Sequence, residues 1–289
     1  MTEPVRHVPV MTAEVLEQLA IRPRGLYVDA TAGMGGHSAE IARRLQTGEL
    51  ISNDRDRESL ALTEANTSEW ASHIRYTQYE FSRLAKALEP GEKADGLLAD
   101  LGVSRYQLTE PSRGFSILAD GPVDMRMDQT TGTTAGELVN FSDEKDLANL
   151  IYRLGEERRA RRIARAIVRA RPIRSTLHLA GVVAMAVPRT GRLHPATRTF
   201  MALRMAVNRE QEELDSLLES GPGMLKPGGR MVVISFMSLE DRKVKERFRE
   251  LERQGKGTIL TKRPLQPSEA EINLNAASRS AKLRALEAA

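Results

Sequence analysis

The stretch that decides the fold is Val28-Asp29-Ala30-Thr31-Ala32-Gly33-Met34-Gly35-Gly36-His37-Ser38. The apolar residues at its start predict a strand over Leu26–Thr31, and the residues after its glycines predict a helix over Ser38–Leu45. Glycines let a backbone turn sharply and approach a ligand without a Cβ in the way. A glycine-rich turn between a strand and a helix indicates a nucleotide site, although a purely structural tight turn would need the same residues.

Outward from this stretch, β-rich runs alternate with helical patterns, which is typical of a parallel sheet covered by helices. The predicted strands are Leu26–Thr31, Leu50–Asp54, Ile74–Glu80, Gly96–Leu101, Arg230–Phe236, Thr258–Thr261 and Ala281–Leu286. The predicted helices between and after them are Ser38–Leu45, Arg57–Asn66, Phe81–Leu88 and Asp241–Leu251.

The middle of the chain breaks this alternation. A Gly/Pro/Asp-rich stretch from Arg105 to Val139 is followed by helical patterns at Asp143–Leu154, Glu156–Ala170, Thr176–Val187 and Ala196–Leu218. We therefore predict an α/β fold: a Rossmann-like sheet with an inserted all-helical domain. The sheet domain would span residues 1–104 and 212–289, and residues 105–211 would form the insertion.

The composition narrows the function classes. The chain has no cysteine, which excludes disulfides, cysteine-ligated zinc and thiol nucleophiles. No apolar run is long enough to cross a bilayer, and Met1–Val10 lacks the pattern of a signal peptide. We expect a cytoplasmic protein without a metal site or a membrane partner.

Asp54 and Ser38 indicate the type of cofactor. Asp54 ends the second predicted strand, 21 residues after Gly33. A carboxylate at this place can accept hydrogen bonds from both hydroxyl groups of a ribose. A dinucleotide fingerprint would require a third glycine or alanine at the position of Ser38. The loop therefore fits the methyl donor S-adenosylmethionine better than a pyrophosphate. On this basis the predicted fold is a Rossmann-like S-adenosylmethionine-dependent methyltransferase sheet, and the inserted helical domain over residues 105–211 would recognise the substrate.

Asp100 lies at the carboxyl end of an apolar strand, where chemistry gathers in doubly wound sheets. Its carboxylate could accept a hydrogen bond from the N–H group of an exocyclic amine. This bond would hold the amine in line with the methyl group and ease the loss of a proton from the amine. It would then be the catalytic residue. Two plainer roles stay open, in which Asp100 only caps the turn or only touches the cofactor.

A basic helix is predicted between Arg158 and Arg169. Helical spacing places four arginines in one stripe, with four apolar residues opposite: Arg158, Arg162, Arg165 and Arg169 against Ala160, Ile163, Ala164 and Ile167. Acids four residues away, which would neutralise the stripe, are missing. Contact with the phosphates of a nucleic acid is favoured over a merely solvated cationic face.

Several longer motifs resemble one known family, the MraW family of ribosomal RNA small-subunit methyltransferases H. They follow in the same order along nearly the whole chain: His7–Met11, Asp29–Ser38, Asp54-Arg55-Asp56, Asp100–Ser104, Arg113–Ser116, Asp120–Asp128, Gly155–Arg158, His194–Phe200, Ile234–Phe236 through Asp241-Arg242, and Arg279–Arg284.

The resemblance implies N4-methylation of a cytidine in the decoding region of 16S ribosomal RNA. S-adenosylmethionine would be the cofactor, and 16S rRNA in the small ribosomal subunit the partner. Oligomeric state stays open, a homodimer included. The expected donor contacts are Gly33, Gly35, Gly36, His37, Asp54, Phe81, Asp100 and Gln107. The expected RNA contacts are Arg126, Arg158, Arg162, Arg165, His194 and Arg198, although His194 could equally serve as a helix-entry residue.

The chain departs from the family pattern at three places. Met237 stands where histidine is usual, Arg105-Tyr106 replaces a common Ser-Pro, and Ala276-Ala277 replaces a usual Pro-Arg. Two other functions therefore stay open. A methyltransferase for a small molecule or a protein would not need the Arg158–Arg169 face, and a non-catalytic RNA-binding assembly factor would not need an intact Asp54 and Asp100.

Overall fold

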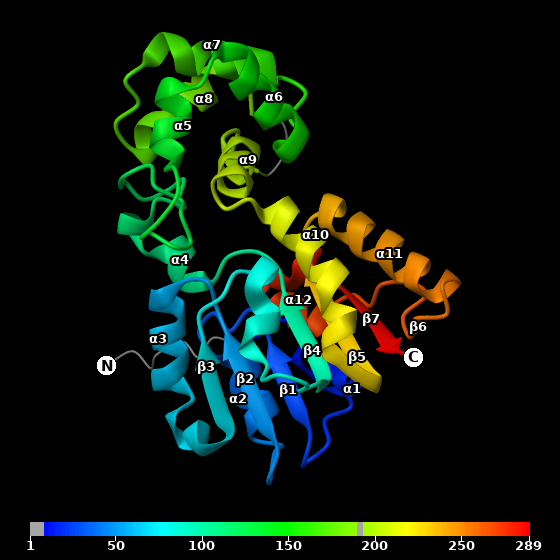
Figure 1. Cartoon of the computed structure of the whole chain (residues 1–289). Coiled ribbons are helices and arrows are strands. Elements are labelled where there is room, and N and C mark those ends of the chain that lie inside the picture. Colours follow the sequence, from blue (N-terminus) through cyan, green and yellow to red (C-terminus); the bar gives the residue numbers. More distant parts are fainter. Residues whose placement is uncertain (1–8, 190–192) are drawn as a thin grey trace. The chain divides into compact units, whose positions relative to one another are not determined.

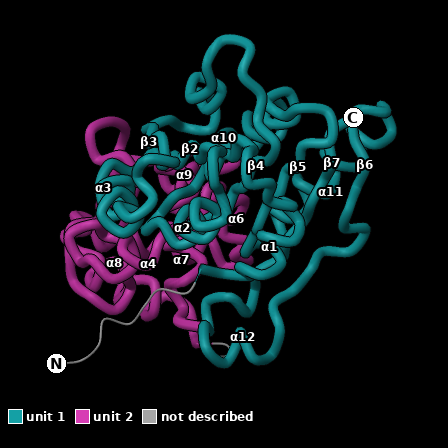
Figure 2. The backbone as a smooth tube through the Cα atoms, turned by 90° about the horizontal axis from the view of Figure 1, so that it is seen from below, with its two compact units in different colours: residues 1–102, 212–289 teal, residues 103–211 magenta. Residues whose placement is uncertain are grey.

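The computed structural model describes residues 9–189 and 193–289. The chain divides into two compact units, which Figure 2 distinguishes by colour. The first unit is formed by the residues up to Gly102 and from Glu212 onward, and the second by Val103–Gln211. Each unit has its own hydrophobic core, so each is described separately.

The first unit contains a mixed sheet of seven described strands in the order β3-β2-β1-β4-β5-β7-β6 (Figure 1). Strands β1 to β5 run parallel, and β7 is antiparallel to β5 and β6. The strands are β1 (Leu26–Asp29), β2 (Glu49–Asn53), β3 (Ile74–Thr77), β4 (Ala94–Asp100), β5 (Leu225–Ser235), β6 (Gly257–Ile259) and β7 (Lys282–Ala288).

Helices cover both faces of this sheet, because successive residues of a strand point to opposite sides. Leu97 belongs to the cluster that includes Leu214 and Phe248 of α10 and α11, whereas Leu98 packs with Val15 of α1. The α-helices are α1 (Thr12–Leu19), α2 (Gly36–Ala42), α3 (Arg57–Asn66), α10 (Glu210–Ser220), α11 (Ser238–Arg253) and α12 (Glu269–Leu274). Short 3₁₀ helices are η1 (Ser68–His73), η2 (Phe81–Ala87), η4 (Gly221–Met224) and η5 (Ala276–Ser280).

The order of the strands positions the candidate site. Strand β1 lies between β2 and β4. The strands that follow β1 are therefore added on one side as far as β3, and on the other side from β4 onward. The loop after β1 and the tip of β4 consequently meet at the carboxyl edge of the sheet, the usual ligand site of such folds. The amide of Ala30 donates to the carbonyl of Leu98 at 2.8 Å, which fixes the two strand ends side by side.

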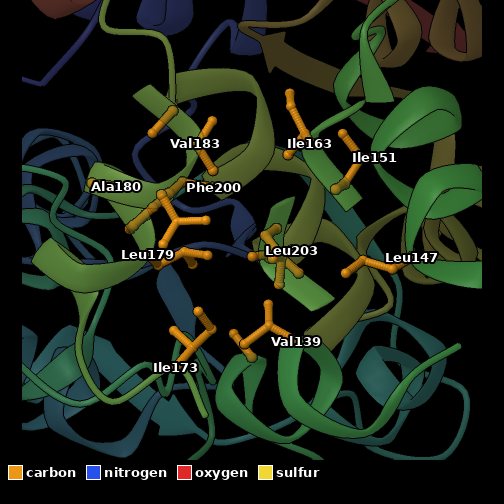
Figure 3. Packing of buried hydrophobic residues seen from close by; sticks show 14 of the residues in the cluster. Val139, Leu147, Ile151, Ile163, Ile173, Leu179, Ala180, Val183, Phe200 and Leu203 are labelled. Atoms are coloured by element: carbon orange, nitrogen blue, oxygen red, sulfur yellow. The ribbon is translucent and has the colours of Figure 1, made fainter. Parts of the chain in front are cut away.

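The second unit is helical. Its elements are α4 (Arg105–Thr109), η3 (Pro111–Arg113), α5 (Ala135–Phe141), α6 (Glu144–Gly155), α7 (Ala160–Ala170), α8 (Thr176–Ala186) and α9 (Thr197–Val207). Figure 3 shows aliphatic side chains from these helices around Leu203 of α9, among them Ile151 of α6 and Ile163 of α7. Helix α7 contributes its apolar face to this core, as its sequence pattern predicts.

These elements confirm the predicted α/β fold class with a helical insertion, but one predicted helix is wrong. Residues Ala196–Leu218 form two helices, because the chain turns at Asn208 and Arg209, which has a φ of 50°. The buried Asn208 amide donates to the carbonyl of Met125 at 2.7 Å, and its Oδ1 accepts the amide of Met127 at 2.7 Å. These bonds anchor the side chain of Asn208 to a distant segment at the point where α9 ends.

Smaller differences have local causes. Helix α7 begins at Ala160 rather than at the predicted Glu156, because Glu156 adopts a left-handed conformation that ends α6. Arg158 therefore lies in the turn before α7 and outside the predicted helical stripe. The helix expected at Phe81–Leu88 is a 3₁₀ helix, and the stretch from Arg105 to Val139 contains the unpredicted α4 and α5.

Candidate active site

The glycine-rich loop connects β1 to α2 through left-handed backbone conformations, with a φ of 57° at Gly33 and 82° at Gly35. A Cβ on Gly35 would also approach the side chains of Thr63 and Thr67 to 3.2 Å or less. Helix α3 holds the loop in return, since Thr63 Oγ1 donates to the carbonyl of Gly33 at 3.0 Å. The loop is thus a fixed concave backbone rather than a simple linker.

Beneath the loop lies a buried polar cluster that the sequence analysis missed. Asp29 accepts a hydrogen bond from Ser38 Oγ at 2.7 Å, and this hydroxyl also pairs with Ser52 Oγ at 2.7 Å. Burial raises the pKa of Asp29, against the opposing effects of His37 and of the hydrogen bonds from Ser38 and the amide of Thr31. Ser38 therefore joins β1, β2 and α2, which gives a structural reason for serine at this position.

Asp54 closes the loop from the end of β2. Its carboxylate accepts the amide of Gly33 at 2.8 Å and the amide of Asp56 at 2.8 Å. Burial raises the pKa of Asp54 to about 7, since these hydrogen bonds offset the cost of desolvation only in part. In doubly wound folds, a carboxylate at the end of the second strand is the group that accepts hydrogen bonds from ribose hydroxyls.

Phe81 is the first residue of η2. It is half-buried against the core that contains Leu84. Asn53, another residue that the sequence analysis missed, fixes the approach of this segment: its amide donates to the carbonyls of Ala30 and Tyr79 and its Oδ1 accepts the amide of Tyr79 at 2.9 Å. One buried side chain thus ties together the ends of β1, β2 and the segment leading to Phe81.

Asp100, at the tip of β4, faces the loop. Its amide donates to Thr31 Oγ1 at 2.7 Å, and its Oδ2 lies 3.6 Å from His37 Nε2. The side chain of His37 is 6% exposed and that of Asp100 is 23% exposed. The structure therefore brings Gly33, Gly35, His37, Asp54 and Asp100 together at one edge of the sheet.

The remaining predicted site residues belong to the second unit. Gln107 is buried and completes a capping box on α4 with Ser104. Arg126 binds Asp124 through two hydrogen bonds of 2.8 and 2.9 Å, so its guanidinium already has a fixed partner. His194 Nδ1 accepts the amide of Ala196 at 3.2 Å beside the start of α9, as a helix-entry residue would. Arg198 is exposed and donates to the carbonyl of Glu156.

The arginines of α7 form an exposed row on the side opposite its buried residues. Arg162, Arg165 and Arg169 are exposed, as is Arg158 in the preceding turn. Arg165 lies 3.3 Å from Glu144 of α6, an acid that the spacing within one helix could not reveal. Because both side chains are solvent-exposed, this ion pair adds little stability and leaves Arg165 accessible.

Neither a membrane span nor a metal centre emerges from the described residues. No described helix is both long and apolar enough to cross a bilayer. Likewise, none of the described histidine and acidic side chains gathers into a group of three or more that could hold an ion.

Known proteins resemble this chain over its length. The model of the MraW methylase family matches residues 4–289. The chain belongs to this family. It is 68% identical to ribosomal RNA small subunit methyltransferase H of Solibacter usitatus (strain Ellin6076) over 97% of this chain and 99% of that protein. The protein of the same name from Acidobacterium capsulatum is 50% identical, with 98% of each chain covered.

Among solved structures, an rRNA methylase from Streptococcus thermophilus covers 100% of this chain, and 98% of that chain is covered, with a TM-score of 0.46 and 13% identity. Family membership, shown by the sequence match, confirms the predicted resemblance. The chain is a methyltransferase that depends on S-adenosylmethionine, as predicted.

The three departures from the family pattern occupy element boundaries. Met237 precedes α11 as its N-cap residue, and its amide donates to Glu240 Oε2 at 3.2 Å as part of a capping box. Arg105 is exposed at the first position of α4. Ala276 and Ala277 are exposed in η5. His7 and Val8 of the first family motif lie outside the described residues.

Proposed function

We propose that this chain transfers a methyl group from S-adenosylmethionine to N4 of a cytidine in the decoding region of 16S ribosomal RNA. The observation that carries the proposal is the carboxylate of Asp100 at the tip of β4. Its Oδ1 is buried and has no hydrogen-bond partner among the described residues, so it is free to accept a hydrogen bond from an N–H group of a substrate. Relatives that match along the whole chain carry the name of a small-subunit rRNA methyltransferase.

The residues of the first unit fit the donor. Gly33, Gly35 and Gly36 offer a backbone cradle without side chains, and Asp54 offers a carboxylate for the ribose hydroxyls. Phe81, His37 and Asp100 complete the proposed donor contacts of this unit. Gln107, which belongs to the second unit, is a further proposed donor contact. When bound, S-adenosylmethionine supplies an electrophilic methyl group on its sulfonium.

Asp100 is the proposed catalytic residue. The lone pair of an exocyclic amine is delocalised into the cytosine ring, so the amine is a weak nucleophile. A carboxylate that accepts a hydrogen bond from one N–H group holds the amine in line with the methyl group. It then receives the proton as the nitrogen becomes cationic. The backbone of Asp100 is fixed for this task by Thr31.

The second unit is proposed to bind the RNA. A cytidine must leave its base stack to react, at a cost of about a few kcal/mol, so a partly assembled small subunit with accessible RNA is the favoured substrate. Arg158, Arg162, Arg165 and Arg198 are exposed and would bind phosphates. Arg126 and His194 already have partners in their own unit. We propose that they hold the backbone of this surface in place. The protein is proposed to act in the cytoplasm, where ribosomal subunits assemble.

The test is methylation of small subunits that lack this modification, taken from a bacterium without its own family member. Purified protein with S-adenosylmethionine should produce one N4-methylcytidine in 16S rRNA, detected by mass spectrometry of nuclease fragments. A methyl group on another molecule would favour a different methyltransferase. Tight RNA binding without any methylation would favour a non-catalytic assembly factor. Chromatography of the active protein decides between a monomer and a homodimer.

A further inference from the structure

His37 is a buried histidine whose ring has no conventional partner. It is the second residue of α2, and its side chain is 6% exposed. Neither Nδ1 nor Nε2 forms a hydrogen bond with any residue that the structure describes. A buried polar group without a partner costs free energy, which makes an additional role for this ring worth seeking.

The nearest acid, Asp100, presents two unlike oxygens. Oδ2 lies 3.6 Å from His37 Nε2, within ion-pair distance but longer than a hydrogen bond. Oδ1 is buried and has no hydrogen-bond partner in the described part of the chain. One oxygen therefore faces the histidine, and the other remains available to a ligand.

The charges around the ring favour an imidazolium. Burial alone would lower the pKa of His37, but Asp100 of β4, Asp29 of β1 and Glu271 of α12 exceed this effect and raise it. Asp29 is itself held by Ser38 and Thr31, and Glu271 is held by the amide of Met11. All three acids come from elements that other bonds fix in place.

We propose that His37 is a positioning residue for Asp100: its imidazolium holds Oδ2 and keeps Oδ1 turned toward the exocyclic amine. This inference rests on the proposed function. Only a proton transfer involves the pair, in which an N–H bond of the amine breaks, its electron pair stays on nitrogen, and an O–H bond forms at Oδ1. His37 thus acts on the reaction through Asp100 in addition to its place in the donor loop.

The first test is independent of activity. The chain has five histidines, and the ring of His37 can be assigned in NMR spectra of isotope-labelled, donor-free protein as the signal that His37→Gln removes. We expect the titration midpoint of His37 to fall by about one pH unit in Asp100→Asn, because the variant lacks the negative charge that stabilises the imidazolium. An unchanged midpoint in a folded variant would overturn the pairing.

The second test separates positioning from donor binding. At saturating donor, His37→Gln should lower kcat about tenfold or more, because glutamine keeps an N–H donor but not the charge. The acid limb of its kcat–pH profile should move to higher pH, a change that the loss of a donor contact alone would not cause. A large rise in Kd with an unmoved acid limb would reduce His37 to a donor contact.

The two proposals can fail separately. If the wild type methylates no RNA but the NMR midpoint still depends on Asp100, the proposed function fails and the pair stands. If the wild type is active but neither the midpoint nor the acid limb moves, the role of His37 fails alone.

Discussion

The amide of Asp100 donates a 2.7 Å hydrogen bond to Oγ1 of Thr31, a residue 69 positions earlier in the chain. This bond joins the tip of β4 to the segment that follows β1. Asp29, in turn, accepts the amide of Thr31 at 3.1 Å. The proposed catalytic carboxylate is thus fixed through a short chain of bonds that ends in a buried acid.

Thr31→Val should disturb Asp100 through this bond. Valine has the shape of threonine without the hydroxyl, so the amide of Asp100 loses its acceptor, at a cost of about 1 kcal/mol in stability. We expect a drop in kcat that exceeds any change in donor Kd. Thr31→Ser keeps the hydroxyl and is the matched control. Equal kcat values for the two variants would contradict a positioning role of the bond.

Asp100→Asn tests the proton acceptor itself. Asparagine has nearly the same shape but cannot take the proton, so the rate of transfer should fall by about two orders of magnitude or more. The donor Kd should change far less, which calorimetry measures. Parallel losses in rate and in donor affinity would make Asp100 a donor ligand only.

Donor binding should depend on pH through Asp54. With its pKa raised to about 7, Asp54 is largely protonated at pH 5.5 and ionised at pH 8 in the donor-free protein. Since a ribose diol requires the ionised carboxylate, affinity should increase as pH rises toward 7 and level off above it. Calorimetry at several pH values measures this, with Asp54→Asn as the variant that binds weakly and loses the pH dependence.

The arginine row of α7 should contribute to RNA binding by charge. Replacing Arg162 and Arg165 together with glutamine should weaken binding and reduce the slope of log K against log salt by about 1 to 2. Arg249→Gln with Arg253→Gln on α11 removes the same charge from exposed positions elsewhere and serves as the control. Identical salt slopes for both double variants would mean that the α7 arginines are only a solvated surface and do not contact RNA.

Two glycines of the second unit offer a paired stability test. A Cβ at Gly155 would lie 2.5 Å from the carbonyl oxygen of Arg198, so Gly155→Ala should destabilise the packing of α6 on α9 by about 1–3 kcal/mol. A Cβ at Gly181 of α8 meets no described atom within 4 Å, so Gly181→Ala should stabilise by up to about 1 kcal/mol. Thermal unfolding measures both, and opposite shifts in Tm are expected.

The grouping of the loop, Asp54 and Asp100 at one edge of the sheet was predictable because its signals are local. The loop, Asp54 and Asp100 each follow a strand whose apolar run is visible in the sequence, and parallel strands bring their carboxyl ends together. The long family motifs then supplied the substrate, which no single residue indicates. In this respect the family resemblance was more specific than the loop.

The parts that were missed depend on contacts between distant residues. Asn208 ends α9 by bonding to a segment 81 to 83 positions earlier, and nothing near Asn208 in the sequence reveals those partners. Glu271 binds the amide of Met11 across 260 positions, which links the unpredicted α12 to α1. Hydrophobic periodicity reports which face of a helix is buried but not which polar side chain replaces a backbone bond.

Helix α7 has one buried face and one charged face, and the two can be altered separately. Ile163, Ala164 and Ile167 are fully buried in the core of the second unit, whereas the arginines between them reach solvent. A change at an arginine can therefore adjust affinity for a polyanion with little effect on folding, and a change at an isoleucine does the reverse. The proposed RNA contacts can consequently change by substitution while the helical core that presents them stays the same.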